Sequence, residues 1–173
     1  EVKTPQQQAG IDVHRLLEKM LKEGPAANTQ PESEIGSWAR ALYPLAPAGA
    51  LSELGYEFAF SPHVLSNKLD WIAPDWSEFG DFKTTAGPKW ALAGPDASPA
   101  KQQAALEGDL QANVEAQGFM TITSRDSVPV RWCYVDKRNP KSAWTVRGVM
   151  TRARTEAFLA EKAVPWMRLI ESL

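Results

Sequence analysis

The stretch from Ile35 to Pro99 constrains the fold of this chain most, because it combines many aromatic side chains with frequent helix- and strand-breaking residues. It contains Trp38, Trp71, Trp76 and Trp90 among numerous prolines and glycines, and its apolar residues follow no sustained period. Disordered segments are poor in aromatic residues, so this composition argues against disorder. Large aromatic side chains in irregular backbone need a surface to pack on.

We therefore expect residues 34–97 to form an irregular Trp/Pro-rich segment with short helices, and its aromatic side chains to contact a partner protein. Tryptophan is enriched among the residues that dominate protein interfaces. The alternatives are that these side chains cover the protein's own sheet or line a small-molecule groove. The interface candidates are Trp38, Trp71, Trp76, Phe79 and Trp90.

The chain has 173 residues, of which 43% are hydrophobic and 23% charged, as in ordinary globular proteins. This length corresponds to one domain with a sizeable core. The net charge of −2 gives no electrostatic reason to expect a nucleic acid as partner. No apolar run approaches the roughly 20 residues of a membrane span, so we expect no transmembrane segment, while peripheral association with a membrane complex stays open.

Residues 1–33 are predicted to form an extended arm, up to residue 9, followed by a helix. Val13, Leu17 and Met20 recur with the spacing of one helical face, and Gly24 followed by proline ends the pattern. Ser33 is a suitable N-cap for a second, short helix. Residues 48–54 are expected to form further helical turns, and residues 56–60 a short strand.

Residues 98–173 show more regular patterns, which predict an α-β-β-β-α core. Ser98 and Pro99 begin a helix that is expected to run to about Gln117. Alternation predicts strands over 119–124, 128–135 and 143–150, then a closing helix from Thr151 or Thr155 that Pro165 kinks or restarts. The predicted fold class is α+β: a three-stranded antiparallel meander flanked by helices, with the N-terminal helix and the long irregular middle. We expect these segments to form one domain.

Catalytic candidates are few, and each has a simpler interpretation. His63, together with Ser61 and either Asp70 or Asp75, supplies the residue types of a hydrolytic triad, but no nucleophile-elbow motif accompanies them. Cys133 is the single cysteine, and a buried inert thiol is the ordinary case. His14 is expected to be a solvated histidine on the flank of the first helix. We assign no catalytic residue.

No motif indicates a metal or a cofactor. Two histidines and one cysteine without close spacing do not make a zinc site, and no glycine-rich phosphate loop is present. We therefore expect neither a metal ion nor a cofactor.

The C-terminal half is rich in arginine and lysine, which superficially resembles an RNA-binding sheet with stacking tryptophans. The simpler interpretation is that the charges are solvated and that Trp132 and Trp144 share the core face. Nucleic-acid binding is therefore not favoured. The basic cluster comprises Arg125, Arg131, Lys137, Arg138, Lys141, Arg147, Arg152 and Arg154.

These observations favour a non-enzymatic interaction protein, an accessory or structural subunit that binds other protein subunits in a larger complex. The alternatives are a periplasmic or secreted binding or inhibitor protein, and a hydrolase that uses Cys133 or His63. The chain starts at Glu1, which is compatible with removal of a presequence. We therefore expect an organellar (mitochondrial) location, with the periplasm as the alternative.

Overall fold

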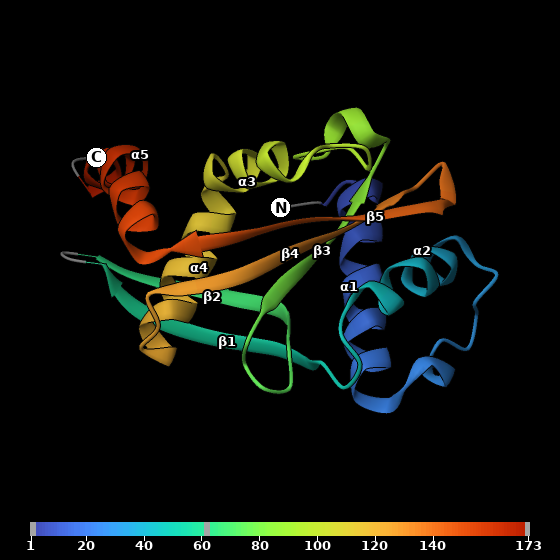
Figure 1. Ribbon diagram of the computed structural model, residues 1–173. Helices are drawn as coiled ribbons and strands as arrows, with labels where there is room; N and C mark the ends of the chain where they lie inside the picture. Colours follow the sequence, from blue (N-terminus) through green and yellow to red (C-terminus); the bar gives the residue numbers. More distant parts are fainter. Residues whose placement is uncertain (1–2, 61–62, 172–173) are drawn as a thin grey trace.

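The computed structural model describes residues 3–60 and 63–171, with only the backbone of residues 166–171. Within these residues the chain forms helices on both sides of a five-stranded mixed sheet, which confirms the α+β class (Figure 1). The sheet order is β1-β2-β3-β4-β5. The strands are β1 (Leu51–Phe60), β2 (His63–Ile72), β3 (Phe79–Thr85), β4 (Ser127–Asp136) and β5 (Asn139–Thr151).

The predicted three-stranded meander is only partly right. β4 and β5 pair antiparallel, as expected, but the other neighbour of β4 is β3, which runs parallel to it. A parallel neighbour needs a long crossover, and two helices supply it, α3 (Pro99–Glu107) and α4 (Leu110–Thr123). β1 and β2 then extend the sheet as an antiparallel hairpin.

The sheet separates two hydrophobic clusters. Helices α1 (Pro5–Glu23) and α2 (Glu34–Leu42) cover one face, on the right in Figure 1, and bury Leu17 and Trp38 there. Helices α3 and α4 cover the other face, where α4 also packs against α5 (Arg152–Glu171). Alternation along β4 divides the side chains as predicted, since Trp132 faces α4 and Cys133 faces α1 and α2.

The middle of the chain is more regular than predicted. The expected helical turns over 48–54 are wrong, because β1 begins at Leu51, and the predicted strand over 56–60 is only its second half. Two further strands, β2 and β3, occupy part of the segment that was expected to be irregular. The predicted extended arm over residues 1–9 is also wrong from Pro5 onward, because Thr4 caps α1 and accepts a hydrogen bond from the Gln7 amide.

A strand predicted over 119–124 is instead the end of α4. This helix is buried on almost every side between α5 and the β1–β2 hairpin, so its sequence lacks the amphipathic period of a surface helix. Gly118 was expected to end the preceding helix but lies inside α4. A Cβ atom there would lie 2.1 Å from the Tyr56 ring, so glycine permits the close contact with β1.

The helix boundaries that depend on capping residues agree better with the sequence. Gly24 ends α1, Ser33 caps α2 and Ser98 caps α3 with Pro99 in the first turn. The closing helix begins at Arg152, one residue after the earlier of the two expected starts, and it continues past Pro165 to Glu171. Within the described residues, no helix is both long and apolar enough to cross a membrane.

Candidate functional site

The two halves of the sheet separate between β2 and β3, and polar residues fill the gap. The two strands pair only at Trp71 with Gly80 and at Ile72 with Phe79. Beyond this point the Phe82 amide donates its hydrogen bond to Oδ2 of Asp70, at 2.7 Å, instead of to a strand carbonyl. The side chain of Asp70 thus replaces a rung of the sheet ladder.

Asp70 lies where the alternation of β2 is interrupted. Leu69 and Ile72 belong to the cluster on the α4 side, whereas Trp71 packs in the cluster on the α1 side. Across the hairpin, Glu53 has a φ of 48°, in the left-handed region that is uncommon for a residue with a side chain. Irregular strand geometry of this kind often re-aims a side chain at a functional site.

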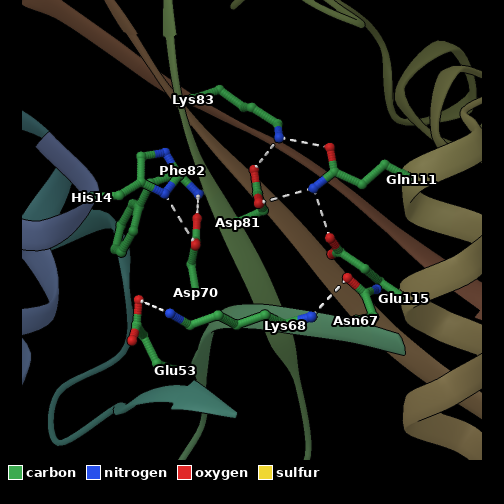
Figure 2. A network of polar contacts seen from close by, with 10 residues as sticks. All are labelled: His14, Glu53, Asn67, Lys68, Asp70, Asp81, Phe82, Lys83, Gln111 and Glu115. Carbon is green, nitrogen blue, oxygen red and sulfur yellow. Dashed lines mark hydrogen bonds and ion pairs between the residues drawn. The ribbon is translucent and has the colours of Figure 1, made fainter. Parts of the chain in front are cut away.

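On the α1 side, Oδ1 of Asp70 lies 3.1 Å from Nδ1 of His14 (Figure 2). Burial lowers the pKa of His14, but the hydrogen bond and the negative charge of Asp70 outweigh it, so the pKa is raised overall. Burial raises the pKa of Asp70, but the hydrogen bond and charge of His14 and the hydrogen bond from the Phe82 amide lower it by more. The pKa of Asp70 is therefore below its ordinary value. The pair therefore favours its charged form.

Asp81 on β3 is a second buried carboxyl group of this cluster. Burial, reinforced by the nearby charge of Asp70, raises the pKa of Asp81 to about 7. Nζ of Lys83 lies 2.6 Å from its Oδ2. A carboxyl group with this pKa exchanges its proton near neutral pH.

The network continues to α4, on the right in Figure 2, through one glutamine. Nε2 of Gln111 donates to Asp81 at 3.1 Å and to Glu115 at 2.6 Å, and its Oε1 accepts from Lys83 at 2.7 Å. Burial, followed by the charge of Asp81, raises the pKa of Glu115 well above its ordinary value. The polar residues thus cross the sheet from α1 to α4 through the gap.

Each end of this network reaches a hollow in the surface. His14 and Asp70 line a groove of about 780 Å³ between α1 and the β1–β2 hairpin. Lys83 and Gln111 line a smaller hollow of about 300 Å³ beside Trp90. The buried network therefore lies between two places where a ligand or a partner side chain can enter.

The five aromatic interface candidates fall into two groups. Trp38, Trp71 and Phe79 are buried in the protein's own core, as the alternative interpretation expected. Trp76 is 36% exposed and stacks on Phe119, with ring centroids 6.1 Å apart. Trp90 is 70% exposed and lies in a short 3-10 turn, so it is the candidate that offers most of its surface to a partner.

The catalytic candidates of the hydrolase alternative are not brought together. Cys133 is fully buried on the α1 side of β4, and burial raises the pKa of its thiol, which disfavours the reactive thiolate. His63 begins β2, at the far end of that strand from Asp70. Ser61, the third member of the suggested triad, lies outside the described residues.

Most arginines of the basic cluster pair with acidic side chains. Arg131 is largely buried and forms a bidentate contact with Glu78, with nitrogen–oxygen distances of 3.0 and 2.5 Å. The expected stacking residues Trp132 and Trp144 lie in the core. The remaining pairs are Arg138 with Asp136, Arg152 with Asp126, and Arg154 with Glu107.

Across residues 3–60 and 63–171, no group of three or more histidine, cysteine or acidic side chains is arranged to hold a metal ion. The cluster around Asp81 is instead held by hydrogen bonds from Gln111 and the charge of Lys83.

The network itself was missed from the sequence. His14 was expected to be a solvated histidine, but it contacts a carboxylate 56 residues away. A signal was present, since Asp70 directly precedes the buried pair Trp71–Ile72, and Asp81 stands between Gly80 and Phe82. Charged residues inside apolar strands are costly unless they are paired, and they commonly mark functional sites.

Comparisons with models of protein families, with curated proteins and with solved structures found no match.

Proposed function

We propose that this protein is a non-enzymatic interaction protein, an accessory subunit of a larger assembly, and that a partner protein docks on Trp90 and the hollow beside it. The observation that carries the proposal is the 70% exposure of Trp90 next to a hollow of about 300 Å³. A tryptophan that fills no part of its own core is available to anchor a partner.

The chemistry of the hollow matches a protein interface. Leu92, Trp132 and Tyr134 contribute apolar surface, while Lys83 and Gln111 contribute polar groups. Interfaces typically combine an apolar centre with a polar rim in this way. A partner side chain of apolar character would fill the hollow, and the ring of Trp90 would cover it.

The local backbone holds Trp90 in a defined position. Its amide donates a 3.0 Å hydrogen bond to the Gly87 carbonyl, and Nζ of Lys89 lies 5.1 Å from the centre of its ring. The amide of Leu92 donates to the Tyr134 hydroxyl at 3.4 Å. Because the backbone that carries Trp90 is already ordered, docking costs less conformational entropy here than it would on a free loop.

Purification of the full-length protein from its source cells under native conditions tests this proposal. Wild-type protein, Trp90→Ala and Val64→Ala are compared, because Val64 is 67% exposed on a different element and serves as a matched control. We expect the same stoichiometric protein to accompany the wild type and Val64→Ala, and to be lost from Trp90→Ala. A partner retained by Trp90→Ala, or no stoichiometric partner for the wild type, would contradict the proposal.

The same purification separates the assembly subunit from a free-standing binding or inhibitor protein. An accessory subunit is expected to elute with several other chains, whereas an inhibitor is expected to elute alone or with one target enzyme. The surface around Trp90 serves either role, and the composition of the purified complex decides between them.

A further inference from the structure

The groove between α1 and the β1–β2 hairpin is distinct from the proposed partner surface. Its volume of about 780 Å³ lies in the range of small-molecule sites. Gly10 lines it from the interior of α1, and a Cβ atom added there would meet nothing within 4 Å. Glycine weakens the middle of a helix, and no close contact at position 10 requires a glycine. The structural effect of Gly10 is that no side chain projects from this position into the groove.

The acidic side chains of the groove already have partners. Glu53 lies 2.5 Å from Lys68, and Glu18 pairs with Lys22. Asp70 accepts from the Phe82 amide and faces His14. Each of these carboxylates is therefore already paired with a cationic group or an amide, which weakens its attraction for a cationic ligand.

The donors of the groove are less occupied. Arg15 is 74% exposed, and its guanidinium lies 3.7 Å from Asp12. Lys3 makes no ion pair with any described residue. The described contacts of His14 use Nδ1, which leaves Nε2 of this groove-lining side chain for a ligand.

From this imbalance we infer that the groove binds a small organic anion, whose carboxylate or phosphate group contacts His14 and Arg15 and whose apolar body lies along Gly10 and Ile11. Charge-assisted hydrogen bonds from histidine and arginine are the usual means of holding such groups. Asp70 supports the site from beneath, because its negative charge favours the protonated imidazole that donates from Nε2.

Every charged group that faces His14 enters this balance. From the sheet these are Asp70, Asp81 and Lys83, and of these the two carboxyl groups favour the imidazolium while Lys83 disfavours it. The other charged residues that line the groove are Lys3, Arg15, Glu18, Glu53 and Lys68. An anion bound at His14 is expected to raise its pKa further, because the protonated form binds more tightly.

Proton NMR gives a direct test, because the chain has two histidines, His14 and His63, and their ring signals can be assigned with His63→Gln. The full chain is titrated with benzoate and with phenyl phosphate, which distinguish a carboxylate from a phosphate ligand, and with benzylamine as a cation of similar shape. We expect a saturable shift of the His14 signal, and a raised pKa of His14, with one or both anions. Saturable binding of benzylamine alone, or no saturable shift with any probe, would overturn the inference.

Two leucine substitutions locate the binding. Gly10→Leu places a side chain in the groove, whereas Gln6→Leu adds the same side chain at an exposed position of α1 that does not line it. We expect Gly10→Leu to weaken anion binding by about tenfold or more, because the added side chain occupies the site, and Gln6→Leu to leave it unchanged. Equal binding by both variants, each folded by circular dichroism, would place the anion elsewhere and contradict the inference. Loss of Trp90 is not expected to affect this binding, so the two proposals can fail separately.

Discussion

Asp70 Oδ1 lies 3.1 Å from Nδ1 of His14, and the other oxygen of the same carboxylate accepts the Phe82 amide at 2.7 Å. One side chain therefore orients the histidine of α1 and also bridges the gap between β2 and β3. This double role links the position of α1 to the place where the sheet divides.

Asp70→Asn is expected to lower the pKa of His14 to below about 6.5, the ordinary value for histidine. The amide keeps the size of the side chain but removes the negative charge, so that burial, which lowers the pKa of His14, prevails. NMR titration of the two histidine rings measures this change. An unchanged pKa of His14 in Asp70→Asn would show that Asp70 does not control it.

The same substitution should change the pH dependence of stability. In the wild type the raised pKa of His14 contributes stability that is fully present below about pH 6.5 and is lost as the pH rises through the higher native value. In Asp70→Asn this contribution should disappear, so the difference in unfolding free energy between wild type and variant should shrink across that interval. Urea unfolding at a series of pH values checks this.

Asp81→Asn tests the second buried carboxyl group. The pKa of Asp81 is raised from 3.8 to about 7, so its favourable contribution is complete below about pH 4 and declines until the pH passes 7. The advantage of wild type over Asp81→Asn should fall over this range, by up to about 4 kcal/mol at 1.36 kcal/mol per pKa unit. Asp96→Asn makes the same chemical change at an exposed position outside the network and serves as the control.

Two helical glycines should respond to alanine in opposite directions. Gly118→Ala places a Cβ atom 2.1 Å from the Tyr56 ring, and we expect a loss of about 1–3 kcal/mol from overpacking. Gly10→Ala meets open space, and the better helix propensity of alanine should stabilise the protein by about 0.5–1 kcal/mol. Urea unfolding of both variants provides the measurement, and a stabilising effect of Gly118→Ala would contradict the packing described for α4.

Gln103 protects the outer edge of β5. Its side-chain amide donates to the Val149 carbonyl and accepts from the Val149 amide, both at 2.8 Å, as a neighbouring strand would. Gln103→Ala should cost about 1–3 kcal/mol, at roughly 0.5–1.5 kcal/mol per hydrogen bond, and should speed hydrogen exchange at the Val149 amide. Lys101→Ala, an exposed change on the same helix, should leave that exchange rate unaltered.

The sequence predicted the parts of the fold that depend on local signals. Ser33, Ser98 and Gly24 mark helix ends because capping is a contact between near neighbours. The alternation around Trp132 identified β4, because successive side chains of this strand point into the two hydrophobic clusters in turn. α4 was mistaken for a helix followed by a strand, because a helix buried on nearly all sides has no polar face to reveal its period.

The candidate site could not be predicted in the same way, because its members come from distant parts of the chain. His14, Asp81 and Glu115 belong to α1, β3 and α4, and no spacing within any one of these elements indicates the others. The sequence around Trp71 and Trp90 did not distinguish a core tryptophan from a surface one, yet Trp71 is buried and Trp90 is 70% exposed. Which aromatic side chain faces solvent depends on tertiary packing.

Site-specific crosslinking in the source cells tests the proposed partner surface most directly. A photoreactive phenylalanine analogue is placed at Trp90 in one variant and at Val64, which is similarly exposed, in another. The proposal predicts a discrete crosslinked protein of one identity from position 90 and none from position 64. No adduct at position 90, or the same adduct from both positions, would contradict the assignment of Trp90 as the partner-binding residue.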